Sequence, residues 1–180
     1  FKIMSLDKLK ILFERQGSKK YGENVTQQEH AIQCYLRAAE SNATLELRVA
    51  AFLHDVGHLL YAEIDVHQKI DFEHEIIGAN FLYELKICDS VVDLIKSHVW
   101  AKRFLITQDS TYMNHLSQAS IDSFYLQGGK LTTEEFNVYS HFSNLQECLT
   151  LRRFDDEAKI EGLVSEIPET VWLDIENCLN

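Results

Sequence analysis

The chain has 180 residues, of which 46% are hydrophobic and 25% are charged. This composition is typical of a folded domain with one buried core and argues against intrinsic disorder, so we expect a single domain over residues 1–180. The formal net charge of −11 repels nucleic acid and anionic membrane surfaces, so we expect no nucleic-acid or membrane partner.

Signals for the start of a helix recur along the chain, whereas turn residues are few. Seven Gly and one Pro are too few for the turns of an all-β fold or for the loops of a Rossmann fold. Capping-box patterns begin at Thr26, Ser90, Thr132 and Ser143, each followed by apolar residues at spacings of three and four. The sequence predicts an all-α bundle with helices near residues 5–16, 27–40, 44–61, 71–86, 90–105, 117–127, 133–141, 144–158 and 168–178.

The chain start and the cysteines predict the cellular compartment. The first four residues lack the features of a signal peptide, and we interpret residues 1–3 as a cloning remnant ahead of a native Met4. The cysteines are widely spaced without a C-x-x-C pair, which predicts reduced, mostly buried thiols rather than zinc ligands or disulfides. We therefore expect a cytoplasmic protein.

Four of the eight histidines recur at predicted helical positions. His30, His54, His74 and His98 are separated by 24, 20 and 24 residues, so that one His from each helix can reach a common centre. His54 is followed by Asp55 in an apolar segment, where a buried carboxylate is costly unless a metal cation neutralises it. Neighbouring helical residues point about 100° apart, so this pair can bind one metal while the second Asp55 oxygen reaches another. Three other histidines lie in polar or loop-like sequence: His67, His115 and His141. We expect them on the surface.

The order of His30, His54-Asp55 and a distal Asp resembles the HD-domain superfamily of helical metal enzymes. The additional pair His74 and His98 resembles its binuclear branch. This resemblance implies two metal sites that share Asp55: His30, His54, Asp55 and Asp155 in one, and Asp55, His74 and His98 in the other. Asp155 and Asp156 are both candidates for the distal carboxylate, and Asp155 is preferred because it stands three residues after Arg152, the spacing that the family shows.

Further segments resemble one oxygenase group within this superfamily. They are Tyr21-Gly22-Glu23, His98-Val99-Trp100-Ala101-Lys102-Arg103, and the stretches 116–120, 126–129 and 151–159. In order and spacing they are similar to the PhnZ-type HD oxygenases, which are related to myo-inositol oxygenase. The resemblance implies a mixed-valent Fe(II)/Fe(III) centre that uses O2 to cleave the C–P bond of an α-hydroxyphosphonate, which yields a carboxylic acid and inorganic phosphate.

Basic residues near the predicted metal ligands suggest an anion pocket. Lys102 follows His98 by four residues, His58 follows His54 by four, and Arg152 precedes Asp155 by three. Such offsets place each pair on one helix face, so we expect Lys102, His58 and Arg152, together with Ser120, to bind the phosphonate oxygens. An alternative role for His58 is to hold a metal ligand through a hydrogen bond.

The resemblance also implies a lid formed by Tyr21 and Glu23. In the family, the Tyr occupies a metal position in the resting enzyme and the Glu contacts the amino group of the substrate. The family places one more residue between them than this chain does, and Tyr21 could instead cap a helix end on the core. We count Tyr21, Glu23, His58 and Lys102 as the candidate catalytic residues.

Two other functions are compatible with the predicted metal ligands. A binuclear HD phosphohydrolase would use metal-bound hydroxide to attack a nucleotide or phosphate ester. An inactive HD domain would only sense a ligand.

Overall fold

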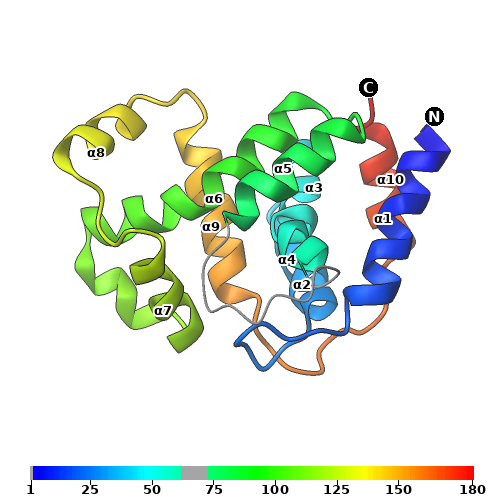
Figure 1. The fold of residues 1–180 in the computed structure, drawn as a ribbon, viewed down its shortest axis with the longest axis horizontal. Helices are drawn as coiled ribbons and strands as arrows, with labels where there is room; N and C mark the ends of the chain where they lie inside the picture. Colours follow the sequence, from blue (N-terminus) through cyan, green and yellow to red (C-terminus); the bar gives the residue numbers. More distant parts are fainter. Residues whose placement is uncertain (1, 62–72) are drawn as a thin grey trace.

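The computed structural model describes residues 2–61 and 73–180, and within these residues it contains helices and no strand (Figure 1). The predicted all-α fold is confirmed. The helices are α1 (Lys2–Gln16), α2 (Gln27–Glu40), α3 (Leu45–Leu53), α4 (Val56–Tyr61), α5 (His74–Glu84), α6 (Asp89–Gln108), the short 3-10 helix η1 (Ser110–His115), α7 (Gln118–Leu126), α8 (Thr133–Ser140), α9 (Leu145–Glu157) and α10 (Glu169–Asn177).

Two of the predicted capping boxes form as expected. At Thr26 and at Thr132 the side chain accepts a hydrogen bond from the backbone N–H three residues later, and the Glu at that position accepts one from the cap residue. Gly128 and Gly129 follow α7 with φ angles of 106° and 68°, a region that favours glycine and ends the helix.

The predicted caps at Ser90 and Ser143 do not form. Ser90 lies inside α6, which begins at Asp89 without a side-chain cap bond. A tertiary contact holds the residue before α6, where the N–H of Cys88 donates to the Cys178 carbonyl at 2.8 Å. Ser143 lies two residues before α9, which also lacks a side-chain cap bond. Pro168 directly precedes α10 and is not part of its first turn.

The predicted helix 44–61 is interrupted at the His-Asp pair. Helix α3 ends at Leu53 and α4 begins at Val56, so His54 and Asp55 lie in the turn between them. Gly57 allows α4 to lie close to α5, because it packs directly on the first residue of α5. A Cβ atom at this position would overlap with the His74 carbonyl oxygen and lie 3.0 Å from the His74 Cα. Helix α4 packs beside α5.

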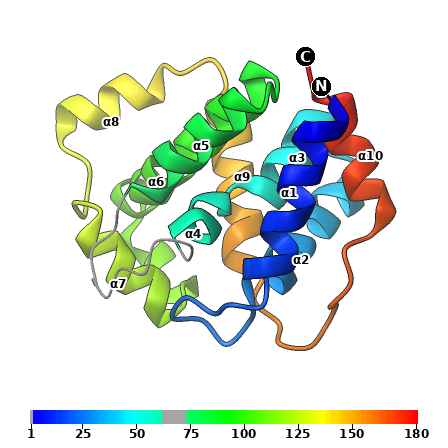
Figure 2. The ribbon, with the colours of Figure 1, turned by 45° about the vertical axis from the view of Figure 1, so that its right-hand side comes forward.

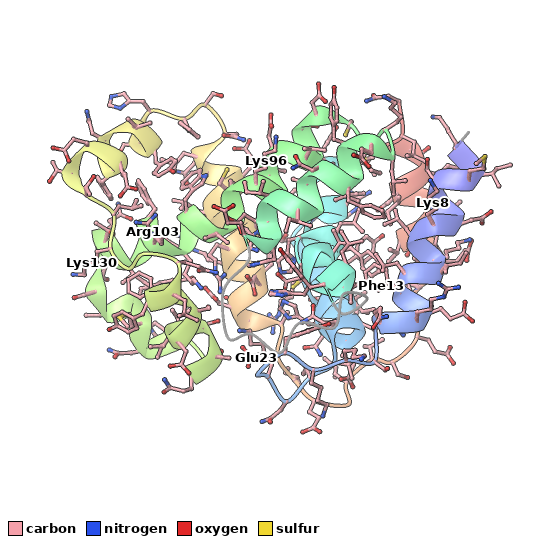
Figure 3. All side chains as sticks on the ribbon, viewed as in Figure 1. Lys8, Phe13, Glu23, Lys96, Arg103 and Lys130 are labelled. Carbon is pink, nitrogen blue, oxygen red and sulfur yellow. The ribbon has the colours of Figure 1, made fainter. Side chains whose placement is uncertain are left out.

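The core lies among α2, α3, α6 and α9, which pack against one another. Helix α5 lies on α6 and α4, while α1 and α10 cover the opposite side, where the two chain ends lie side by side (Figures 1 and 2). Phe13 on the inner face of α1 stacks on Phe52, with ring centroids 4.6 Å apart, while Lys8 points outwards (Figure 3). Within the described ranges, no helix is both long enough and apolar enough to cross a bilayer.

Candidate metal centre

The predicted metal ligands come together in the middle of the helical bundle. His30 projects from α2, His74 is the first residue of α5, His98 lies midway along α6 and Asp155 lies in the last turn of α9. His54 and Asp55 occupy the α3–α4 turn. All of these residues except the half-buried Asp55 are buried. The packing of five segments thus determines the site.

One group of donor atoms surrounds His30. Its Nε2 lies 3.2 Å from His54 Nε2 and 3.2 Å from Asp155 Oδ1. The Oδ2 atom of Asp55 lies 3.5 Å from His30 Nε2 and 3.4 Å from His54 Nε2. Four side chains therefore direct nitrogen or carboxylate oxygen atoms toward one small volume.

A second group surrounds the other oxygen of Asp55. The Nε2 atoms of His74 and His98 lie 2.9 Å apart, and each is 3.5 Å from Asp55 Oδ1. With metal–ligand bonds of about 2.1 Å, adjacent ligands in octahedral or tetrahedral geometry lie about 3.0 to 3.4 Å apart. Both donor groups are close to this spacing, so they are suited to two metal ions that share Asp55.

Backbone carbonyl groups orient three of the imidazoles. In each of them Nδ1 donates a hydrogen bond to a carbonyl oxygen, so that Nε2 faces the site. Imidazoles that bind metals are commonly held in this way. The distances are 2.8 Å from His30 to Ala158, 2.9 Å from His54 to Ala51 and 2.7 Å from His98 to Ile95.

The protonation states of several side chains also suit metal binding. Burial lowers the pKa of His98 to about 4, so this imidazole is neutral at pH 7. Burial opposes ionisation of Asp55, but His54 outweighs it and holds the pKa of Asp55 well below its usual value. Burial also opposes ionisation of Asp155, but Arg152 and His54 outweigh it and hold the pKa of Asp155 well below its usual value. Burial opposes protonation of His30 and His54, but the neighbouring Cys34, Asp55 and Asp155 outweigh it and raise the pKa of both imidazoles well above the usual value. Because metals bind neutral imidazoles and ionised carboxylates, a bound metal ion would displace the protons from His30 and His54.

A cavity of about 880 Å³ opens onto these donor groups. Its basic and hydroxyl-bearing lining residues are suited to an anionic ligand. Every residue predicted to bind substrate or to form the lid lines it, together with Lys159. The predicted residues are Tyr21, Glu23, His58, Lys102, Ser120 and Arg152.

Residues 28–119 of the chain match the model of the HD-domain family. The chain belongs to the HD-domain family. It is 38% identical over 171 residues to hydroxymethylphosphonate dioxygenase of Gimesia maris. This alignment covers 93% of this chain and 85% of the relative. It is 34% identical over 151 residues to the glycine-betaine-forming [1-hydroxy-2-(trimethylamino)ethyl]phosphonate dioxygenase of Leisingera caerulea, which covers 82% of this chain and 76% of the relative. The predicted resemblance to phosphonate-cleaving HD oxygenases is confirmed.

The two adjacent aspartates of this HD domain have different surroundings. Asp155 contacts the histidines, whereas Asp156 forms an ion pair with Arg152 and accepts a hydrogen bond from the Tyr112 hydroxyl at 2.6 Å. Arg152 also contacts Asp155, with Nη1 2.7 Å from Oδ2. Its buried Nε has no hydrogen-bond partner among the described residues. The guanidinium group thus holds a predicted metal ligand as well as lining the cavity.

Lys102 and His58 differ in how they reach the cavity. The buried Lys102 donates to Ser123 Oγ at 2.7 Å and to the Ser120 carbonyl at 3.3 Å. His58 is not on the same helix as His54, because the chain turns between them. The prediction that these two histidines lie on one helix face is therefore wrong. The His58 ring instead stacks on His74, with centroids 4.0 Å apart, and on Tyr21, with centroids 5.2 Å apart.

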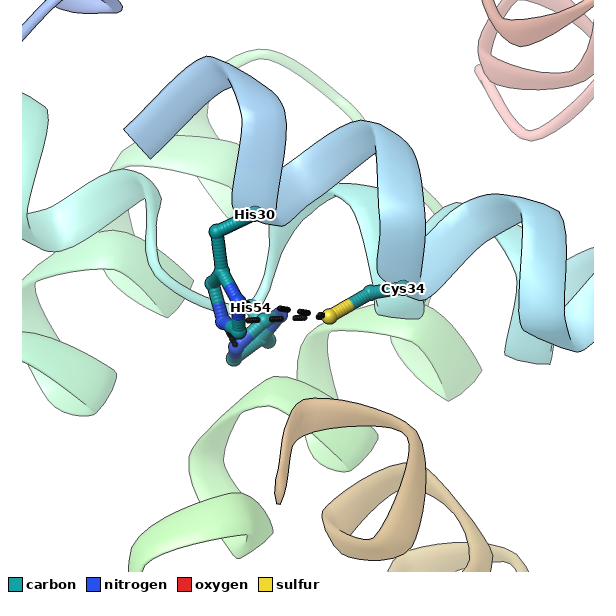
Figure 4. A group of neighbouring side chains, drawn as sticks. All are labelled: His30, Cys34 and His54. Atoms are coloured by element: carbon teal, nitrogen blue, oxygen red, sulfur yellow. Dashed lines mark hydrogen bonds between the residues drawn. The ribbon is translucent and has the colours of Figure 1, made fainter. Parts of the chain in front are cut away.

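Cys34 lies beside the first donor group, which the sequence patterns did not predict (Figure 4). Its Sγ is 3.7 Å from His30 Nε2, and it forms with His30 and His54 a group that could hold a metal ion. The available signal was its position one helical turn after His30. All four cysteines are free thiols, and three of them are buried.

Several histidines and arginines lie outside the donor groups. His115 and His141 are exposed, as predicted, and His67 lies outside the described residues. Arg153 is also exposed. Arg103 donates to the Gly129 carbonyl at 2.8 Å and so holds the loop after α7.

Proposed function

We propose that this chain is an O2-dependent HD-domain dioxygenase that binds two iron ions, one Fe(II) and one Fe(III), and cleaves the C–P bond of an α-hydroxyphosphonate. The products are a carboxylic acid and inorganic phosphate. The observation that carries this proposal is Asp55, whose two oxygens face separate pairs of imidazoles beside a cavity with basic side chains. The similarity to two phosphonate dioxygenases over most of the chain supports it.

In this proposal, the two donor groups supply the ligands of the two iron ions. His30, His54, Asp55 and Asp155 would hold one ion, and Asp55, His74 and His98 the other. Imidazole and carboxylate ligands suit iron, although they also suit zinc and manganese. Bound iron would supply the activation of O2 that a protein side chain cannot provide.

The remaining cavity residues would bind and orient the substrate. A phosphonate is an anion, and in a chain of net charge −11 it needs local cations to enter. Lys102 and Arg152 would supply them, while the Ser120 hydroxyl and His58 would donate further hydrogen bonds. The Tyr21 ring stacks on His58, and in this proposal it helps to exclude water from the metal centre.

The atom balance of this reaction needs no external reductant. The substrate carbon carries one oxygen before the reaction and two in the carboxylic acid. Phosphorus carries three oxygens before the reaction and four in phosphate. One O2 therefore supplies one oxygen atom to each product, and the substrate supplies all four electrons.

The dependence on O2 distinguishes this proposal from phosphohydrolase activity. With iron-loaded protein we expect phosphate release from an α-hydroxyphosphonate to stop under anaerobic conditions and to resume in air. With ¹⁸O2, mass spectrometry should find one labelled atom in each product. Hydrolysis of nucleotides or phosphate esters at equal rates without O2 would instead establish the phosphohydrolase alternative.

The proposal also specifies the partner and the compartment. The partner is a small phosphonate rather than nucleic acid, in keeping with the net charge of −11. The four free thiols are typical of a protein in the reducing cytoplasm.

A further inference from the structure

Lys159 lines the cavity but has no role in the function proposed above. It directly follows Ala158, whose carbonyl oxygen accepts from His30 Nδ1 at 2.8 Å. The N–H of the next residue, Ile160, donates to Gln33 Oε1 of α2 at 3.0 Å, and the Ile160 carbonyl oxygen accepts from Gln33 Nε2 at 2.7 Å. Hydrogen bonds thus hold the backbone on both sides of Lys159 against α2. The position from which the Lys159 side chain extends is therefore fixed.

The ammonium group of Lys159 forms an ion pair with Glu23 at the cavity wall. Nζ lies 2.6 Å from Glu23 Oε1, 2.9 Å from Ser120 Oγ and 3.1 Å from Ser117 Oγ. Ser117 Oγ donates to the same Glu23 oxygen at 2.6 Å. The Lys159 and Glu23 side chains are only 16% and 21% exposed, so solvent screens this pair weakly. The negative charge of Glu23 is therefore already balanced inside the protein.

Glu23 is the carboxylate in the described cavity lining that could otherwise bind a cationic substituent. Asp55 and Asp155 belong to the metal centre. Asp122 is exposed and accepts a hydrogen bond from Gln118 at 2.8 Å. A substrate ammonium group would have to displace Lys159 from Glu23 and leave a second, unpaired ammonium nearby, which is unfavourable in a partly buried site. An uncharged substituent would leave the ion pair intact.

We infer that the Glu23–Lys159 pair makes the enzyme selective for α-hydroxyphosphonates whose carbon substituent is uncharged, with hydroxymethylphosphonate as the simplest example. Lys159 is then a specificity-determining residue. Lys159 forms an ion pair with the Glu23 carboxylate, so that a positively charged substituent has no free carboxylate to bind. This inference rests on the proposed function.

The test compares two substrates in three iron-loaded proteins: the parent chain, Lys159→Met and the control Lys130→Met. The substrates are hydroxymethylphosphonate and 2-amino-1-hydroxyethylphosphonate, and the quantity compared is the ratio of their kcat/KM values. We expect the parent to favour hydroxymethylphosphonate. Lys159→Met should shift the ratio toward the amino substrate by about tenfold or more, because the released Glu23 carboxylate can pair with the ammonium group. Lys130 is exposed, and its variant should keep the parent ratio.

An equal loss of both activities in Lys159→Met would overturn the inference, because Lys159 would then serve a general role in binding the phosphonate. A parent preference for the amino substrate would overturn it as well. If Lys159→Met does not fold, Lys159→Gln removes the charge but retains hydrogen-bonding capacity toward the serines, and the same outcomes apply. If the parent cleaves neither phosphonate, the proposed reaction is wrong. In that case, anaerobic calorimetry measures the affinity of the parent protein for each of the two phosphonates. Tighter binding of the amino compound contradicts the inferred selectivity.

Discussion

Lys102 and Arg152 both line the cavity, but they are held by different partners. Lys102 contacts a serine hydroxyl and a carbonyl group, whereas Arg152 is paired with Asp155 and Asp156. We predict that Lys102→Met retains both metals and loses roughly 30- to 1000-fold in kcat/KM, the effect of removing one charge-assisted contact of about 2–4 kcal/mol. Metal analysis and phosphate release measure the two effects separately. Unchanged kcat and KM in Lys102→Met would show that the phosphonate binds elsewhere.

For Arg152→Met we predict loss of metal as well as activity. The substitution leaves two carboxylates without their buried cation, and breaking a buried ion pair typically costs about 3–5 kcal/mol. Asp155 would then no longer be held toward His30 and His54. The neighbouring Arg153 is exposed, so Arg153→Met is a matched control that should keep both metals. Full metal content in Arg152→Met would show that Asp155 does not depend on this arginine.

At the scale of helices, the close approach of α4 and α5 determines where His74 lies. Gly57 leaves no room for a Cβ atom against the His74 backbone. We predict that Gly57→Ala displaces the start of α5 and loses about one metal per chain, as His74→Ala should, with an overpacking cost of about 1–3 kcal/mol. Gly129→Ala is the control, because Gly129 has a φ of 68° in open space, so its strain should lower stability without metal loss. Two metals retained in Gly57→Ala would contradict this role.

At the scale of the whole molecule, Asp174 connects α10 to the core helices. Its Oδ2 accepts from Arg48 Nε at 2.8 Å and from the Tyr35 hydroxyl at 2.9 Å. Burial alone would raise the pKa of Asp174, but these two bonds outweigh it and lower the pKa below its usual value. A lowered carboxyl pKa stabilises the fold above the unfolded-state pKa of about 3.9, and the stabilisation disappears as pH falls through the folded-state pKa.

We therefore predict that Asp174→Asn lowers the free energy of unfolding by about 1–3 kcal/mol at pH 7. The difference from the parent should narrow as the pH falls below about 4. Urea unfolding at a series of pH values measures it, and comparing the two proteins cancels the titration of the other carboxylates. Asp7→Asn, at an exposed position on α1, should show little effect. A difference that persists unchanged at pH 2 would contradict the assigned ion pair.

Features that depend on neighbouring residues could be predicted from the sequence alone. The capping boxes at Thr26 and Thr132 involve residues three apart, and periodic apolar residues predicted the all-α fold. The regular spacing of four histidines, together with Asp55, predicted which side chains come together. The capping boxes and the all-α fold were predictable because local backbone geometry and helix periodicity determine them. The histidine spacing predicted one donor from each helical segment, but their convergence depends on how the helices pack.

Only the tertiary structure decided the arrangement around Asp55 and Glu23. The chain turns at His54-Asp55, where α3 ends and α4 begins, and from this turn the two Asp55 oxygens face different imidazole pairs. Gly57 allows α4 to pack closely on α5. Lys159 meets Glu23 across 136 residues of sequence, and Tyr112 meets Asp156 across 44. No short-range pattern encodes such pairs, because they form only when packed helices bring distant segments together. The sequence by itself thus determined the helices and the donor residues, while packing decided which oxygen faces which histidine and which charges are already paired.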